Sequence, residues 1–207
     1  MTSKPIEPEQ TGGVHYFQEQ LSATVHHFYL SGEIGPAINY IEMIHAIRMA
    51  PPNDVIKLHL NTTGGQLDTG IQIINAMRES MAHIICVLEA QAYSMGSLIF
   101  LSGNEFVVQE SSVLMIHNFS GGVFGKGHEQ RSRLEAVSEW FEGFSHPLYV
   151  PFISQEEFDM VIDGKDMWIH TDEIETRLNA MIQSKIEPAI KNAPVTKKKP
   201  RSRKKTK

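Results

Sequence analysis

The chain has 207 residues, of which 41% are hydrophobic and 21% charged, a composition that suits one soluble globular domain and excludes an intrinsically disordered body. Its formal net charge of −5 is unevenly spread, because eight of the 19 basic residues lie between Lys197 and Lys207 and the rest of the chain is strongly acidic. The lone cysteine, Cys86, excludes an internal disulfide and is expected to be a buried core residue in a reducing compartment.

Both ends of the chain are predicted to lie outside the folded domain. The first 22 residues are polar, with acids and prolines where a secretory signal needs an apolar stretch, and no later run reaches the length of a membrane span. We therefore expect a cytoplasmic protein. The basic tail is expected to be disordered, and contact of this tail with nucleic acid, an acidic surface or a nuclear import receptor stays open. The expected division is a flexible leader at 1–22, a folded domain at 23–190 and a tail at 191–207.

The first predicted strand and helix follow the polar leader. The apolar, aromatic and β-branched run TVHHFYL predicts a strand that ends near Gly32. Pro36 suits the first turn of a helix, which the prolines at 51 and 52 stop. Isoleucines recur in this helix at every third position and are expected to form one buried face: Ile38, Ile41, Ile44 and Ile47.

The next predicted elements continue the alternation of strand and helix. VIKLHLN predicts a strand that leads through Gly64 and Gly65 into a second helix, whose expected buried side chains are Leu67, Ile71, Ile74 and Met77. HIICVL predicts a third strand, followed by a turn at 90–92 and a buried helix in SMGSLIFLSG. Two short strands are expected at EFVVQ and VLMIHN. This order favours an α/β layered fold with a largely parallel sheet.

The remaining part of the domain is predicted to be mainly helical. A glycine-rich segment at 120–127 precedes a long helix that is expected to break near Pro147 and Pro151, and whose apolar residues include Leu134, Val137, Phe141 and Phe144. Ser154 and Glu157 have the spacing of a capping box, which predicts another short helix.

Three segments contain residue types that suit nucleophilic catalysis. Ser94 lies where a strand gives way to an apolar helix, so the free N–H groups of the helix N-terminus face any oxyanion formed beside it. His117 ends a strand and can take a proton from a serine hydroxyl, while Asp166 follows a Gly-Lys turn and can orient a histidine. Each residue also has an ordinary structural explanation, as a helix cap, a core histidine and a turn aspartate respectively.

Five segments taken together resemble the proteolytic subunit of Clp protease. FYLSGEI matches the family's opening strand, LHLNTTGG its N-S-P-G-G loop, QAYSMGS its Q-A-A-S-M-G nucleophile turn, VLMIHN its V-M-I-H-Q strand, and GKDMWIHTDE its aspartate region. The segments follow the family's order. The 29 positions from Gly65 to Ser94 and the 49 from His117 to Asp166 also agree with it, and the resemblance extends from about residue 24 to residue 175.

The resemblance implies a crotonase-like (ClpP-like) α/β subunit with a protruding helical handle, acting as a serine endopeptidase on unfolded polypeptides or peptides. Ser94 would be the nucleophile, His117 the general acid and base, and Asp166 the orienting carboxylate. Backbone N–H groups of Gly65 and Met95 would form the oxyanion hole. The mechanism needs no metal or other cofactor, and the chain has no phosphate loop of the form G-x-x-x-x-G-K-[ST].

The resemblance also implies partners. Two stacked rings, heptameric by family likeness and hence a tetradecamer, would enclose a proteolytic chamber, with the long helix at the ring-to-ring contact. Substrate would add as a strand beside residues 120–127. A Clp-type AAA+ unfoldase is expected to dock in a changed way, since the positions aligned with its hydrophobic pocket carry Lys57, His59, Glu89 and Gln109.

Some family features are missing from this sequence. There is no clear counterpart of the opening segment that forms axial loops, Thr62-Thr63 replaces Ser-Pro before the glycines, and IETRLNAMIQSK stands where the family has G-[LI]-[VI]-D. The alternatives are another enzyme of the same fold clan, either a signal-peptide-peptidase-like hydrolase or an acyl-CoA enzyme, and a catalytically silent ring subunit. Neither an acyl-CoA enzyme nor a silent subunit has a reason to keep Ser94, His117 and Asp166 together.

Overall fold

The structure is a computed structural model that describes residues 22–122 and 124–191. The predicted leader at 1–22 and the basic tail at 191–207 fall outside these residues except for one residue each, so both stay predictions. No helix in the described part of the chain combines the length and apolar character needed to cross a bilayer.

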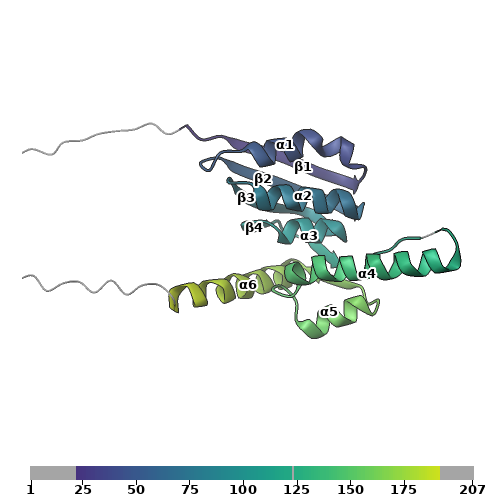
Figure 1. Cartoon of the computed structure of the whole chain (residues 1–207). Coiled ribbons are helices and arrows are strands. Elements are labelled where there is room, and N and C mark those ends of the chain that lie inside the picture. Colours follow the sequence, from purple (N-terminus) through teal and green to yellow (C-terminus); the bar gives the residue numbers. More distant parts are fainter. Residues whose placement is uncertain (1–21, 123, 192–207) are drawn as a thin grey trace, which may run out of the picture.

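Strands and helices alternate through the first half of the described chain, as predicted (Figure 1). In order they are β1 (Val25–Ile34), the short 3₁₀ helix η1 (Ala37–Tyr40), α1 (Ile41–Met49), β2 (Val55–Gly65), α2 (Leu67–Glu79), β3 (His83–Tyr93) and α3 (Met95–Leu101). The second half contains β4 (Glu105–Val108), β5 (Val113–Ile116), α4 (Gly127–Tyr149), α5 (Gln155–Ile162), β6 (Met167–His170) and α6 (Thr171–Lys191).

A single six-stranded sheet organises the described residues, with the order β1-β2-β3-β5-β6 and with β4 also paired to β3. Every pairing is parallel except that of β5 with β6, which confirms the predicted α/β fold with a largely parallel sheet. Because β2, β3 and β5 run in the same direction, their carboxyl ends meet at one edge of the sheet. The antiparallel β6 brings its first residues to that same edge.

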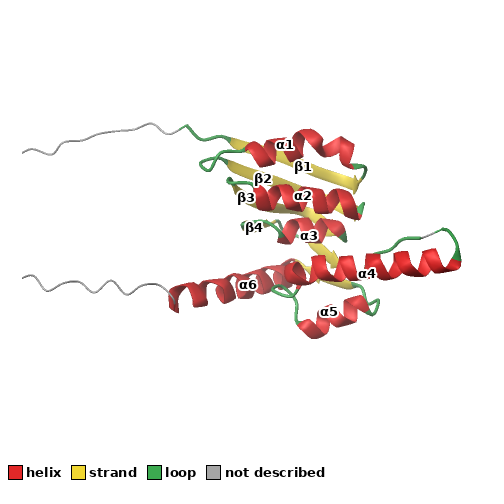
Figure 2. Ribbon diagram, in the orientation of Figure 1, coloured by secondary structure: helices red, strands yellow, loops and turns green. Residues whose placement is uncertain are grey.

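Helices α1, α2 and α3 lie side by side over one face of the sheet (Figure 2). Alternate residues of β2 and β3 point into this layer and are fully or almost fully buried: Ile56, Leu58, Leu60, Ile84, Cys86 and Leu88. Burial raises the pKa of the Cys86 thiol to about 12, so this residue is the core cysteine that the sequence predicted. All seven residues of α3 are buried, which places the start of this helix firmly against the sheet edge.

Helix α4 leaves this layered body and projects beyond the sheet at its N-terminal end (Figure 1). The predicted end of this helix near Pro147 and Pro151 is confirmed, since the helix ends at Tyr149 between them, but Pro147 itself lies inside the helix. A proline inside a helix removes one backbone hydrogen bond, and here the packing of the helix end compensates, since Ser145 and Tyr149 on either side are buried.

Two other sequence expectations also differ from the structure. The predicted turn at 90–92 is wrong, since β3 continues to Tyr93 and pairs there with β5. The predicted buried face of four isoleucines is only half confirmed. Ile44 and Ile47 are buried, whereas Ile38 is 76% and Ile41 45% exposed. An α-helix turns about 100° per residue, so residues spaced by three are about 300° apart, which is about 60° short of a full turn. Four side chains with this spacing therefore spread around the helix and cannot all face the core.

Candidate active site

The predicted site residues lie at one edge of the sheet, where three parallel strands end. Gly65 is the last residue of β2, Ser94 follows β3 and His117 follows β5. Asp166 directly precedes β6, which runs antiparallel to β5 and therefore begins at the same edge. In α/β sheets, ligands generally bind outside the carboxyl ends of the strands, so this edge is the expected location of a site.

Ser94 has a strained backbone conformation, with φ 54° and ψ −122°, and is one of two non-glycine residues with positive φ in the described chain. It occupies the N-cap position of α3, but its side chain makes no capping hydrogen bond. The ordinary explanation of Ser94 as a helix cap therefore has no support in the structure. A strained serine between a strand and a helix is instead the geometry of a nucleophile elbow, which exposes the hydroxyl above the sheet.

Hydrogen bonds from three elements hold the Ser94 turn. The Ser94 N–H donates to the carbonyl of Met115 in β5 at 2.9 Å, and the Ser94 carbonyl accepts from the Ser97 hydroxyl at 2.6 Å. The buried Tyr149 hydroxyl, from the end of α4, lies 2.8 Å from Ser97 Oγ. Burial raises the pKa of Tyr149, so its hydroxyl stays protonated and able to donate. Sequence reasoning missed Tyr149, because its contact spans about fifty residues and has no local pattern.

Of the two glycines at the end of β2, Gly64 packs against the Ser94 turn and Gly65 packs against β1. A Cβ on Gly64, whose φ is +87°, would lie 2.6 Å from the Tyr93 carbonyl oxygen and 2.7 Å from Ser94 Cβ. Gly65 has φ +149°, and a Cβ there would collide with the backbone of Ile34. Only glycine fits at either position, so the β2 backbone comes directly beside the serine.

Thr62 fixes the backbone before the two glycines through its hydroxyl group. Its hydroxyl donates to the Gly32 carbonyl at 2.5 Å and accepts from the Gly64 N–H at 3.1 Å. The side chain is completely buried. The loop before Gly65 is thus fixed by hydrogen bonds to β1 rather than by a proline ring.

A cavity of about 300 Å³ opens at this edge and brings four of the five predicted residues together. Gly65, Ser94, Met95 and His117 all line it. Its apolar walls come from α2, α3, the segment after His117 and the inner side of α4, through Leu67, Leu98, Phe119, Leu134, Val137 and Phe141. A cleft with apolar walls and a few polar groups is the usual form of a peptide or small-molecule site.

Asp166 lies one residue beyond the pairing of β5 with β6, as His117 does on the other strand, and it does not line this cavity. Ile116 and Met167 form the last pair of this ladder. Asp166 is exposed and His117 half-buried, and in the described residues no hydrogen bond joins the side chain of His117 to that of Ser94 or Asp166.

Asn118 fixes the segment that follows His117. Its side-chain amide donates to the Ile162 carbonyl at 2.8 Å, and its side-chain oxygen accepts from the Phe119 N–H at 2.8 Å. The described residues of the predicted substrate-binding segment at 120–127 form no strand, and its last residue begins α4. Within the described chain, no group of three or more histidine, cysteine, aspartate or glutamate side chains is arranged to hold a metal ion.

One comparison with known protein families bears on this site. The family model described as Clp protease matches residues 25–142, which is more than half of the chain. The matched segment contains Gly65, Ser94, Met95 and His117, whereas Asp166 lies beyond its end.

Proposed function

The chain belongs to the Clp protease family, a family of serine peptidases, and we propose that it cleaves unfolded polypeptides or peptides as an endopeptidase through Ser94, His117 and Asp166. The observation that carries this proposal is the backbone of Ser94, held at φ 54° and ψ −122° with a side chain that caps nothing. Such strain costs of order 1–3 kcal/mol and persists where function requires it. The cavity that Ser94 shares with His117 supports the same assignment.

In the proposed reaction, His117 takes the proton from the Ser94 hydroxyl as the serine oxygen attacks the peptide carbonyl, and then returns it to the leaving amine. Asp166, which precedes β6 where His117 follows β5, is proposed to orient the imidazole and stabilise its cation. Catalytic hydrogen bonds are often long or poorly aligned without substrate and tighten when it binds, so the lack of a hydrogen bond between the His117 and Ser94 side chains in the described residues is compatible with this role.

Two backbone N–H groups are proposed to bind the oxyanion. Met95 is the first residue of α3, where a helix leaves its N–H groups without helical partners. Gly65 lines the cavity from the opposite side of Ser94 and, without a side chain, lets substrate approach its backbone. Donors fixed before the reaction stabilise the developing negative charge without reorganisation, which is usually a large part of catalysis.

Two of the three alternative functions, the acyl-CoA enzyme and the silent ring subunit, account less well for this edge of the sheet. An acyl-CoA enzyme of the same fold clan would use backbone N–H groups but needs no strained serine beside a histidine. A catalytically silent ring subunit needs neither oxyanion-binding N–H groups nor a strained serine beside a histidine. The Ser94 turn, with its hydrogen bonds to β5 and its contact with Gly64, supports the peptidase.

Members of the Clp protease family generally form oligomeric rings. We propose that this chain forms two stacked heptameric rings around a chamber, in the cytoplasm. Exposed apolar side chains on and beside the projecting part of α4 support a contact there: Phe124, Leu134 and Trp140. Sedimentation is expected to give a multi-subunit particle, and a stable monomer at micromolar concentration would contradict this assembly.

The proposed changed docking of a Clp-type unfoldase is supported by the side chains on the outer face of the sheet. His59 Nδ1 lies 2.6 Å from Glu89 Oε1, and the His59 ring stacks on Tyr29 with centroids 4.4 Å apart. Lys57 lies on the same side of β2, two residues before His59. An apolar loop that covered these polar groups without replacing their partners would bind weakly. Tight binding of a standard unfoldase in a pull-down, with efficient ATP-dependent degradation, would overturn this part of the proposal.

Replacing Ser94 with alanine tests the proposed function. Ser94→Ala removes one hydroxyl from a turn and no core volume, so folding and assembly are expected to be unchanged. Cleavage of fluorogenic peptides is expected to fall by about 10⁴- to 10⁶-fold. Retention of the original rate by an assembled Ser94→Ala protein would show that another group performs the reaction.

A further inference from the structure

The cavity beside Ser94 has one permanently charged side chain in its lining, that of Arg133. Of the other lining residues, only His117 and Tyr149 can ionise, and the rest are apolar residues, glycines, serines and one glutamine. No lining residue carries a permanent negative charge. A positive charge in an otherwise neutral cleft favours a ligand that brings a negative one.

Arg133 is not neutralised by a neighbour within the described residues. The ion pairs formed there by arginines involve Arg48 and Arg177, and Arg133 takes part in none. The carboxylate best placed on the helix to reach it is Glu129, one turn earlier. Glu129 instead accepts a hydrogen bond from the Lys126 backbone N–H at 3.1 Å, at the start of α4. The guanidinium therefore has its donors available for a substrate.

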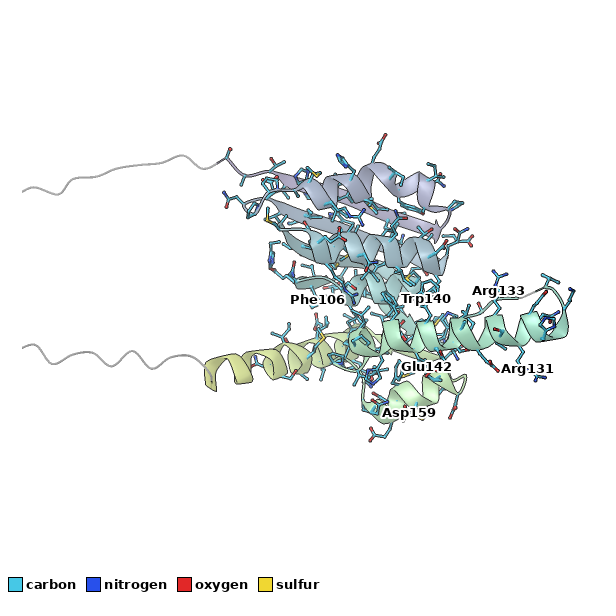
Figure 3. All side chains as sticks on the ribbon, in the orientation of Figure 1. Phe106, Arg131, Arg133, Trp140, Glu142 and Asp159 are labelled. Carbon is cyan, nitrogen blue, oxygen red and sulfur yellow. The ribbon has the colours of Figure 1, made fainter. Side chains whose placement is uncertain are left out.

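The position of Arg133 on α4 directs it to the cavity. It lines the cavity together with Leu134, Val137 and Phe141, which follow at spacings typical of one side of a helix. Arg131, two residues earlier, is about 200° away around the helix. Figure 3 shows Arg131 and Arg133 projecting from opposite sides of α4, and Arg131 does not line the cavity.

We propose that Arg133 is a specificity-determining residue that selects peptide substrates carrying a carboxylate close to the bond that is cleaved. This inference rests on the proposed peptidase function and names its substrate class. A guanidinium binds a carboxylate through two parallel hydrogen bonds, and the apolar walls beside it hold the adjoining part of the peptide. Arg133 is exposed to solvent, so the selectivity is modest, about two- to fivefold, and falls as salt is raised.

The carboxylate has two possible sources in a peptide, an acidic side chain or the free C-terminus. Quenched fluorescent peptides with an amidated C-terminus, which carry either Glu or Gln at each position around the cleaved bond, test the side chain. The same neutral sequence with a free or an amidated C-terminus tests the terminal carboxylate. Mass spectrometry of the products locates the cleaved bond in each peptide.

The wild-type protein is expected to cleave one carboxylate-bearing peptide with a kcat/KM about two- to fivefold above that of its neutral partner, mainly through a lower KM. In Arg133→Gln this ratio falls to about one, and in Arg133→Lys part of it returns. Arg131→Gln removes the same charge from the opposite side of α4 and is expected to keep the wild-type ratio. A merely structural role of Arg133 would change both peptides equally.

The outcomes separate this inference from the function on which it rests. If the wild-type protein cleaves charged and neutral peptides equally, or if Arg133→Gln keeps the preference, the role of Arg133 is refuted and the peptidase function stands. If no peptide is cleaved, or if cleavage survives in Ser94→Ala, the proposed function itself fails.

Discussion

Strands β2 and β3 contribute to two regions that are held in different ways. At their carboxyl ends, Ser94 is fixed through backbone hydrogen bonds and through Gly64, which packs against it. On the outer face, which we define by His27, Tyr29, Lys57, His59 and Glu89, the contacts are between side chains, such as the 3.0 Å contact of His27 with His59. Tyr29 on this face is 70% exposed.

This difference shows where the chain can change without losing its chemistry. A turn defined by backbone geometry tolerates few substitutions, because a new Cβ at Gly64 or Gly65 has no space. A partly exposed sheet face tolerates many substitutions, because its side chains contribute little to the packing of the core. The polar outer face and the intact Ser94 turn agree with this difference in tolerance to substitution.

Among the four substitutions Asp166→Asn, Gly65→Ala, Glu157→Gln and His59→Ala, the first is expected to have the largest effect on catalysis. The amide cannot stabilise a histidine cation and favours the wrong tautomer, so kcat is expected to fall by as much as about 10⁴-fold. Peptide hydrolysis at saturating substrate measures this. Asp163→Asn changes the same group three residues earlier, at the end of α5, and is expected to stay within twofold of wild type. Equal activity of both variants would show that Asp166 has no catalytic role and is only a turn residue.

Gly65→Ala is expected to lower kcat/KM by about 10²- to 10³-fold, because the β2 end must shift and takes one oxyanion donor with it. The new Cβ would collide with the Ile34 backbone. Gly32→Ala is the matched control, since Gly32 also has positive φ but has nothing within 4 Å of the added Cβ. This control is expected to cost about 1 kcal/mol of stability and little activity. Similar kinetics for the two variants would argue against an oxyanion role for Gly65.

The ion pair between α5 and α6 is expected to affect stability more than activity. Arg177 makes two hydrogen bonds to Glu157, of 2.7 and 2.8 Å, and these bonds lower the pKa of Glu157 from 4.5 to about 2. A lowered folded-state pKa means that the contribution is complete above about pH 4.5 and is lost as the pH falls toward 2. Allowing for partial exposure, Glu157→Gln is expected to cost about 1–2 kcal/mol at pH 7.

Denaturant unfolding at pH 7 and pH 3 measures this contribution. The difference between wild type and Glu157→Gln is expected to shrink at pH 3, because the carboxyl of the unfolded wild-type chain, with its ordinary pKa of 4.5, is then mostly protonated, and this proton uptake favours the unfolded state. A difference that is the same at both pH values would mean that the charge of Glu157 contributes little.

His59→Ala is expected to have the smallest effect on catalysis. The substitution removes the contacts with His27 and Glu89 on the outer face but leaves the Ser94 turn untouched. Cleavage of small peptides is expected to stay within about twofold of wild type, since the lost hydrogen bonds affect stability by only about 1 kcal/mol. A tenfold loss in kcat/KM, with the assembly intact, would show that the outer face and the active edge are coupled.

The sequence predicted the elements that local patterns define. Alternating apolar residues marked β2 and β3, and the spacing of Ser154 and Glu157 marked the start of α5, whose capping box the structure contains. The differences from the structure occurred where tertiary packing overrides local preference. The buried end of α4 carries the helix through Pro147, and pairing with β5 extends β3 through the predicted turn at 90–92.

The residues of the candidate site also fall into two groups, those that a local sequence motif identifies and those that only the folded structure brings to the site. Ser94 and His117 were found because each lies in a motif with a recognisable order and spacing, and they do share a cavity. The supporting Tyr149 and the charged Arg133 were not found, since both come from α4 and meet the Ser94 region only through folding. A single sequence has no local signal for such contacts.

The most direct test of the central claim is the reaction of Ser94 with an active-site-directed fluorophosphonate. An activated serine forms a covalent adduct, whereas a serine that only caps a helix does not react. The account predicts one adduct per chain, mapped by mass spectrometry to Ser94 and absent from Ser94→Ala, with loss of peptide hydrolysis in step with labelling. No adduct in an assembled protein, or an adduct on a different serine, would contradict it.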